Sequence, residues 1–133
     1  MSEIRVPISP GEMLDKITIL RIKSRRMTDP LKLRNVRAEL DALQATWAAS
    51  DYAQADIAAD EAALLAVNER LWVIEDDIRD KERAQAFDAR FIELARAVYF
   101  ENDERAALKR RINIRLGSGL VEEKSYSDYR QRP

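Results

Sequence analysis

The sequence predicts an all-α protein, an antiparallel bundle of about four long helices with short extended N- and C-terminal arms. The composition is the first observation: 133 residues include only three glycines and four prolines, while 46% are hydrophobic and 35% charged. This balance suits long helices better than turn-rich sheets. The second is that apolar residues recur at steps of three and four over four long stretches. The third is that helix-start signals precede three of these stretches. A chain of this length is expected to form a single helical domain, residues 1–133.

Residues 1–8 are expected to form the N-terminal arm. Ile4, Val6 and Ile8 alternate with polar residues, which is the period of a short half-buried strand or an extended segment. Pro7 has no backbone N–H, and it therefore restricts such a strand to the edge of a sheet.

The first helix is expected from about Pro10 to Thr28. Ser9 is suited to the N-cap, proline is favoured at the first helical position, and Glu12 completes a capping box. Apolar residues cover much of this helix, which indicates a central position. They are Met13, Leu14, Ile17, Ile19, Leu20, Ile22 and Met27.

The second helix is expected to begin at Pro30, because Asp29 is suited to the N-cap. The turn before it is short, so the first two helices should form an antiparallel hairpin. One apolar seam follows the helix: Leu33, Val36, Leu40, Leu43 and Trp47. Small and polar residues then predict a loop at 49–56.

The third helix is expected from about Ile57 to Ala84 and the fourth from about Ala89 to Leu116. Asp88 is suited to the N-cap of the fourth helix, and Gly117 to its C-cap. The tail, residues 117–133, has no helical period, and its tyrosines suggest an extended segment lying against the bundle.

Several polar residues occur where these helices should pack: Asp15, Asn68, Asn102, Arg105 and Lys109. A buried charge costs several kcal/mol unless it is paired, so these side chains should meet one another or line a cavity. The sequence therefore predicts a polar pocket between the first, third and fourth helices.

A second polar strip continues this set along the third helix, through Trp72, Glu75 and Arg79, with Asp76 at its border. Trp72 is a candidate platform for a ring, and Glu75 a candidate orienting carboxylate. The alternative is that Glu75 and Arg79 form an ordinary surface ion pair four residues apart. The predicted ligand-binding residues are Asp15, Lys16, Asn68, Trp72, Glu75, Asp76, Arg79, Asn102, Arg105 and Lys109.

The composition also limits the chemistry. The chain contains no cysteine and no histidine, which excludes thiolate and imidazole catalysis. Carboxylates without histidine suit Mg²⁺, and such a site requires at least three of Asp15, Glu75, Asp76 and Glu101 to converge on one cation. No metal ligand is assigned, and the cofactor is left unknown.

The charges and hydropathy set expectations about partners and location. The net charge of −1 provides no overall attraction for nucleic acid or an anionic membrane, although a local patch stays open. The basic run at 108–115 lies among acids and is expected to be a solvated face. No apolar stretch is long enough to span a membrane, and no secretory signal begins the chain, so a cytoplasmic protein is expected.

Four separated blocks of the sequence resemble a known family. They are "VPISPGEMLDKITILRIKSRRMTDPLKLRNVRAEL", "VNERLWVIEDDIRD", "FDARFIELARAVYFENDERAALKRRIN" and "GLVEEKSYSDY". The chain is similar to small bacterial all-helical proteins, a domain of unknown function found beside or fused to glycosyltransferases of surface-polysaccharide assembly. The family's motif positions include the predicted ligand-binding residues and five more that are not assigned to the site: Lys23, Glu122, Glu123, Lys124 and Tyr126.

The resemblance implies an accessory or small-ligand-binding role in bacterial surface-glycan (lipopolysaccharide) biosynthesis, with a glycosyltransferase as partner. The ligand class follows from the residues instead: forked arginines suit a phosphate or carboxylate group, and the indole of Trp72 suits a sugar or nucleobase ring, so a phosphorylated or sugar ligand is expected. Two alternatives stay open. One is a Mg²⁺-dependent hydrolase of nucleotides or nucleotide sugars. The other is a structural interaction module or homodimer, for which Trp47 and Tyr52 near the loop are the candidate contacts. No nucleic-acid partner is expected.

Overall fold

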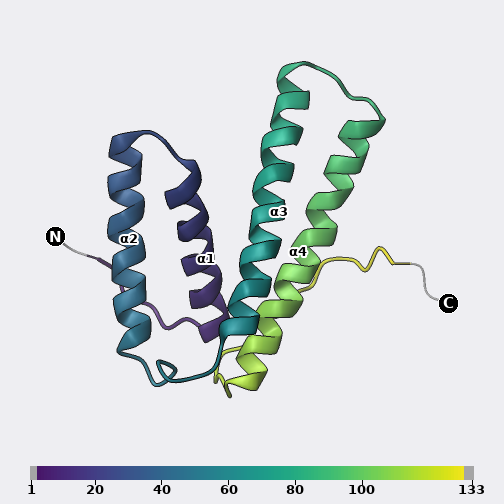
Figure 1. Cartoon of the computed structure of the whole chain (residues 1–133). Coiled ribbons are helices and arrows are strands. Elements are labelled where there is room, and N and C mark those ends of the chain that lie inside the picture. Colours follow the sequence, from purple (N-terminus) through teal and green to yellow (C-terminus); the bar gives the residue numbers. More distant parts are fainter. Residues whose placement is uncertain (1–2, 131–133) are drawn as a thin grey trace.

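The computed structural model describes residues 3–130, so that residues 1–2 of the predicted arm and 131–133 of the predicted tail lie outside the described part. The chain forms four helices: α1 (Pro10–Arg26), α2 (Pro30–Ala48), α3 (Ala58–Arg83) and α4 (Ala89–Arg115) (Figure 1). No strand occurs within residues 3–130. The predicted all-α fold is confirmed, and the observed helix ends lie within two residues of the expected ones.

Local signals explain where the helices begin and end. The Ser9 side chain accepts a hydrogen bond from the Glu12 backbone N–H at 3.1 Å, and Asp29 and Asp88 cap α2 and α4 in the same way. The predicted capping box is only half present, because no hydrogen bond from the Glu12 side chain to the Ser9 backbone occurs among the described residues. Gly117 has a φ of 68°, the left-handed conformation that glycine adopts at little cost after a helix.

The four helices form two hairpins, α1–α2 and α3–α4, which meet at one end and diverge toward their turns (Figure 1). α1 packs against all three other helices, whereas α2 packs against α1 alone among the described helices. The shared core lies where α1 meets α3 and α4, and it consists of Leu14, Leu64, Val67, Leu108 and Ile112. Burying each such side chain contributes roughly 1.5–3 kcal/mol, so this end holds the hairpins together.

Gly11 brings the start of α1 unusually close to α4. Its backbone N–H donates a hydrogen bond to the Asn113 Oδ1 at 2.7 Å. A Cβ atom added to Gly11 would lie 2.5 Å from the backbone carbonyl oxygen of Lys109. Glycine is therefore required here for the approach of two backbones, and this approach sets the position of α1 over α4.

The arm and the tail differ in what they contact. Ile4 is 93% exposed and Val6 is 66% exposed, so of the two expectations for the arm the half-buried strand is not found, and the described part of the arm is an exposed segment without regular secondary structure. The tail runs along α4 (Figure 1), where Tyr129 packs against Tyr99 with ring centroids 4.8 Å apart. No backbone hydrogen bond joins the arm to the tail within residues 3–130.

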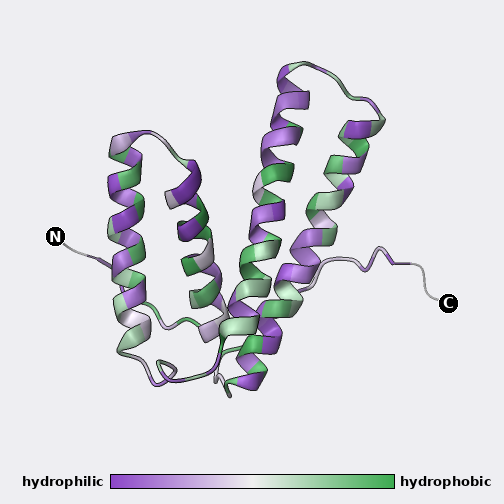
Figure 2. Ribbon diagram, viewed as in Figure 1, coloured by the Kyte–Doolittle hydropathy of each residue, from purple (hydrophilic) through white to green (hydrophobic). Residues whose placement is uncertain are grey.

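The ribbon coloured by hydropathy shows apolar residues where the two hairpins meet and mostly hydrophilic residues in the ends of α1 and α3 that lead into the outer turns (Figure 2). Within residues 3–130, no helix combines the length and the hydropathy needed to span a membrane.

Candidate functional site

A buried polar network ties α1 to α3 and α4. Asp15 of α1 is fully buried. The Arg105 guanidinium donates to it from Nε to Oδ1 at 2.8 Å and from Nη2 to Oδ2 at 2.5 Å. Asn68 of α3 donates from Nδ2 to Asp15 Oδ1 at 3.0 Å and to Thr18 Oγ1 at 2.9 Å. In the part of the chain described, no buried side-chain nitrogen or oxygen lacks a hydrogen-bond partner, so the network is complete without a ligand.

The network keeps Asp15 ionised. Burial by itself raises the pKa of this carboxyl, because a charge is poorly solvated inside a protein. The hydrogen bonds from Arg105 and Asn68 and the positive charges of Arg105 and Lys109 outweigh burial, and the pKa of Asp15 lies below its ordinary value of 3.8. The hydrogen bond to Asp15 raises the pKa of Arg105 in turn. The pair is therefore a fixed carboxylate and guanidinium at neutral pH.

Lys109 lies one helical turn beyond Arg105 and joins three parts of the molecule. Its Nζ is 2.6 Å from Glu12 Oε2 on α1 and 3.0 Å from Glu122 Oε2 on the tail. Only 11% of the Lys109 side chain is exposed. Burial lowers the pKa of the ammonium, but the hydrogen bonds to Glu12 and Glu122 together with the negative charges of Glu12 and Asp15 outweigh it and raise the pKa. Lys109 is thus a charged, nearly buried cation that holds a carboxylate of the tail.

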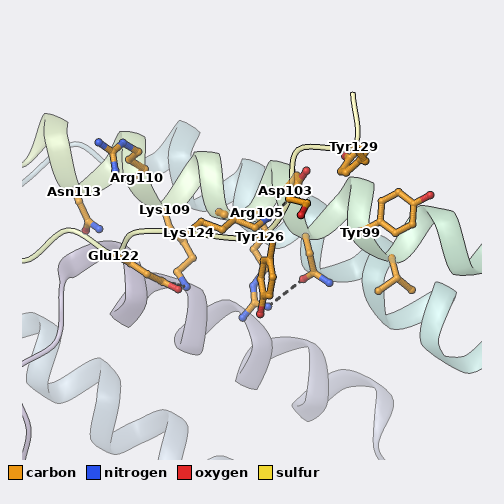
Figure 3. A pocket seen from close by; sticks show the side chains of 14 residues that line it. Tyr99, Asp103, Arg105, Lys109, Arg110, Asn113, Glu122, Lys124, Tyr126 and Tyr129 are labelled. Atoms are coloured by element: carbon orange, nitrogen blue, oxygen red, sulfur yellow. Dashed lines mark hydrogen bonds and ion pairs between the residues drawn. The ribbon is translucent and has the colours of Figure 1, made fainter. Parts of the chain in front are cut away.

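A cavity of about 850 Å³ lies between α4 and the tail. Figure 3 shows the side chains that line it, from α4 on one side and from the tail on the other. The lining combines cations, acids and phenol rings with small apolar groups. The charged and aromatic members are Arg105, Lys109, Arg110, Lys124, Asp103, Glu122, Tyr99, Tyr126 and Tyr129.

The tail is fastened over this cavity by charge and by aromatic packing. Lys124 pairs with Asp103 of α4, and the Arg110 Nη1 lies 2.9 Å from Glu123 Oε1. Tyr129 also packs against the Phe100 ring, with centroids 5.0 Å apart. Apart from Asp103 and the nearly buried Lys109 that holds Glu122, these charged groups are at least one third exposed, and exposed ion pairs contribute only about 0–1 kcal/mol each. Most of the tail contacts are therefore individually weak, and the pair between Glu122 and Lys109 is the one with a nearly buried partner.

The structure brings together half of the residues predicted for the site. Asp15, Asn68 and Arg105 form the network, and the Asn102 Oδ1 lies 3.4 Å from Arg105 Nη1. Arg105 and Lys109 also line the cavity, so they connect the network to the pocket.

The other half lies elsewhere. Lys16 and Asp76 are exposed, and Trp72 is half-buried outside the cavity lining. The Arg79 Nε lies 3.2 Å from Glu75 Oε2, which is the surface pair that the sequence left as the alternative. For the four residues of α3 the reason is geometric, because residues beyond Asn68 follow α3 toward its turn, where the two hairpins diverge (Figure 1). Lys16 lies on α1, and its Nζ is 3.7 Å from the Glu12 carboxylate that also pairs with Lys109.

The position of the pocket also differs from the prediction. The space between α1, α3 and α4 is occupied by the Asp15 network, whereas the cavity opens on the outer face of α4 under the tail. Paired side chains fill the space between these helices, because each carboxylate and amide there has a partner on a neighbouring helix. For buried polar groups, such pairing costs less free energy than an open cavity in which they stay unpaired.

The geometry required for a magnesium-dependent hydrolase is not found among the residues described. Within that part of the chain, no group of three or more acidic side chains is placed to hold a metal ion. Asp15 is held by Arg105, and Glu101 pairs with the Arg70 Nε at 3.0 Å. For the interaction-module alternative, Trp47 and Tyr52 are half-buried and stack on each other at 5.9 Å.

Some cavity residues were not predicted from the pattern of the chain. Tyr99, Asp103 and Tyr129 were not predicted as site residues, and Glu122 and Tyr126 entered only through the family resemblance. The residues of α4 that line the cavity recur mostly at steps of three and four, so they share one face of the helix. The sequence pattern does not indicate that the tail covers this face.

Comparison with known proteins found no match among protein families, curated proteins or solved structures. The candidate site is therefore defined by its geometry alone.

Proposed function

We propose that this chain binds a small anionic ligand that also carries a ring, in the cavity between α4 and the tail. Lys109 is the observation on which the proposal depends. This nearly buried cation holds the carboxylate of Glu122, which comes from an irregular segment and is itself 66% exposed. A phosphate or carboxylate group of a ligand can replace Glu122 at Lys109 without opening the helical core.

Aromatic groups support a ring-bearing ligand. Tyr126 is 85% exposed although it lines the cavity, and apart from the Lys124 Nζ, which lies 5.7 Å from the ring centroid, its ring is accessible to a partner. Stacking on an aromatic side chain contributes about 1–3 kcal/mol per nucleobase, and a large amphipathic ring such as tyrosine combines apolar contact with a polar hydroxyl. The volume of about 850 Å³ falls in the usual range for small-molecule sites.

Phosphorylated sugars and nucleotide sugars combine the two features, an anion and a ring. The proposed accessory role in bacterial surface-glycan biosynthesis rests on the resemblance of four sequence blocks alone, because comparison with protein families found no match. In that role the chain holds a sugar phosphate or nucleotide sugar for a glycosyltransferase partner. The proposal includes no catalytic step, because within residues 3–130 no three acids are placed to hold one metal ion.

The test is a thermal-shift screen followed by calorimetric titration. The ligands are a nucleotide sugar, a sugar 1-phosphate, the matching unphosphorylated sugar and inorganic phosphate. At a concentration of 100 times Kd, a ligand stabilises the folded state by about 2.7 kcal/mol, which corresponds to a rise in Tm of roughly 5–10 °C. We expect this rise with the phosphorylated sugars and a negligible rise with the unphosphorylated sugar.

Two variants locate the ligand. Tyr126→Ala removes an exposed ring, so it should leave the Tm of the free protein unchanged and weaken binding about tenfold, or 1.4 kcal/mol. Lys109→Met should abolish binding. The control is Arg79→Ala, which removes an exposed cation from α3 far along the chain from the cavity. Ligand binding that survives both Tyr126→Ala and Lys109→Met would place the site elsewhere.

A further inference from the structure

The end of the α1–α2 hairpin carries a dense positive charge that the net charge of the chain conceals. Residues 21–37, which we call the basic hairpin end, contain seven arginines and lysines and a single acid, Asp29. This segment has a net charge of +6 in a chain whose net charge is −1, so the remaining residues carry −7. The molecule is therefore strongly dipolar.

Most of these cations have no internal partner. Arg21 and Arg26 form ion pairs with Glu61 and Glu69 of α3. The other five form no ion pair within residues 3–130, and four of them are exposed while Lys23 is half-buried. They are Lys23, Arg25, Lys32, Arg34 and Arg37.

The fold places these cations at one end of the hairpin. Only residues 27–29 separate α1 from α2, so the chain reverses direction there and the end of α1 lies beside the start of α2. At 1.5 Å per residue, every member of residues 21–37 lies within about 12 Å of this turn along the helix axes. Because α2 packs against α1 alone among the described helices, its outer faces stay open (Figure 1). Hydrophilic residues cover the end of α1 next to the turn (Figure 2).

One exposed apolar side chain lies among the cations. Leu31, in the first turn of α2, is 67% exposed. No aromatic residue occurs between positions 21 and 37, although proteins that hold single-stranded nucleic acids stack bases on aromatic side chains. Basic residues around an exposed apolar residue instead suit the headgroup region of an anionic bilayer.

We propose that the basic hairpin end docks on the surface of an anionic lipid bilayer, with its cations on the lipid phosphates and Leu31 entering the headgroup layer. The negative charge on the rest of the molecule is repelled by the same surface, so it orients the hairpin end toward the lipid. The cavity under the tail lies on the other hairpin, and docking is independent of ligand binding there.

The experiment is sedimentation of the full chain with vesicles of phosphatidylcholine alone or with about one third phosphatidylglycerol. We expect binding to the anionic vesicles only, and a steep loss of binding between about 0.05 and 0.3 M salt as the charges are screened. The variant Lys32→Glu/Arg34→Glu should bind at least tenfold more weakly. The matched control Arg79→Glu/Arg96→Glu makes the same change in net charge at exposed cations outside residues 21–37 and should bind within about twofold of the native chain.

Two further measurements identify what the hairpin end binds. Leu31→Ser should reduce binding to anionic vesicles while leaving the salt dependence in place. An RNA oligonucleotide and inorganic phosphate, each added as a competitor, should leave most of the protein on the vesicles. Failure of the native chain to bind anionic vesicles overturns the proposal, as does equal binding by the two charge-reversal variants. Preferential transfer to the RNA would make nucleic acid the partner. Tyr126→Ala should bind vesicles normally, which separates this result from that of the ligand screen.

Discussion

At the scale of single residues, Asp15 shows how a charge is kept inside this small fold. Transferring one carboxylate from water to the interior costs several kcal/mol. Arg105 offsets this cost with two hydrogen bonds, and Asn68 adds a third at 3.0 Å. Because the guanidinium is planar and always charged, it satisfies both oxygens of the carboxylate at once.

The first prediction follows from this pairing. Asp15→Asn keeps the size of the side chain but leaves the part-buried Arg105 guanidinium without a negative partner. We expect the free energy of unfolding to fall by about 3 kcal/mol. This is near the lower end of the range of about 3–5 kcal/mol for breaking a buried ion pair, because Arg105 retains some contact with solvent. Urea denaturation measures it. The control Glu75→Gln breaks the exposed pair with Arg79 and should cost less than about 0.5 kcal/mol.

The same variant should alter the dependence of stability on pH. The pKa of Asp15 is lowered in the folded state, so its contribution is fully present above the ordinary value of 3.8 and is lost as the pH falls through the lower folded value. The native chain should therefore lose more stability than Asp15→Asn between about pH 5 and pH 2. Parallel pH profiles for the two proteins would show that the charge of Asp15 contributes nothing.

At the scale of helices, the contact between α1 and α4 depends on the absence of a side chain at Gly11. Alanine is favoured over glycine inside a helix by about 1 kcal/mol, so propensity alone predicts that Gly11→Ala stabilises the protein. The structure predicts the opposite, because the added Cβ meets a backbone carbonyl at 2.5 Å, and a backbone cannot rotate aside as a side chain can.

We expect Gly11→Ala to reduce the free energy of unfolding by about 2 kcal/mol, within the usual range for overpacking. Gly119→Ala is the matched control, since nothing lies within 4 Å of a Cβ atom at that position. Urea denaturation of the two variants measures the difference. Gly11→Ala with native stability or more would mean that the two helices separate easily.

At the scale of the whole molecule, the helices and the tail have different structural roles. The helices bury the apolar core and the Asp15 network, whereas the tail covers the cavity through exposed ion pairs and the Tyr129 ring. Removal of residues 119–133 should therefore lower the Tm by only a few degrees and leave the helical circular dichroism of the remaining chain intact.

In the same truncated chain, binding of the phosphorylated ligand should be lost, because one wall of the cavity and its phenol rings are gone. Calorimetric titration measures this loss. If the truncated chain unfolds, the tail is required for folding. If the truncated chain still binds the ligand, the binding site consists of residues on the helices alone.

The helices and their ends could be predicted from the sequence because their causes are local. Ser9, Asp29 and Asp88 cap backbone groups only two or three residues away, and the apolar period shows which face each helix buries. The same physics identified Asp15 and Arg105 as unusual, since a charged residue within an apolar stretch requires a partner wherever it lies.

Only the tertiary structure decided which partners meet. Asp15 and Arg105 are 90 positions apart, and their pairing depends on how closely Gly11 lets α1 approach α4. Trp72 and Arg79 fit the polar strip by spacing, but the divergence of the hairpins leaves them outside the site. The tail has no helical period, so its place over α4 follows from charge pairs and aromatic contacts between distant segments, which local patterns do not contain.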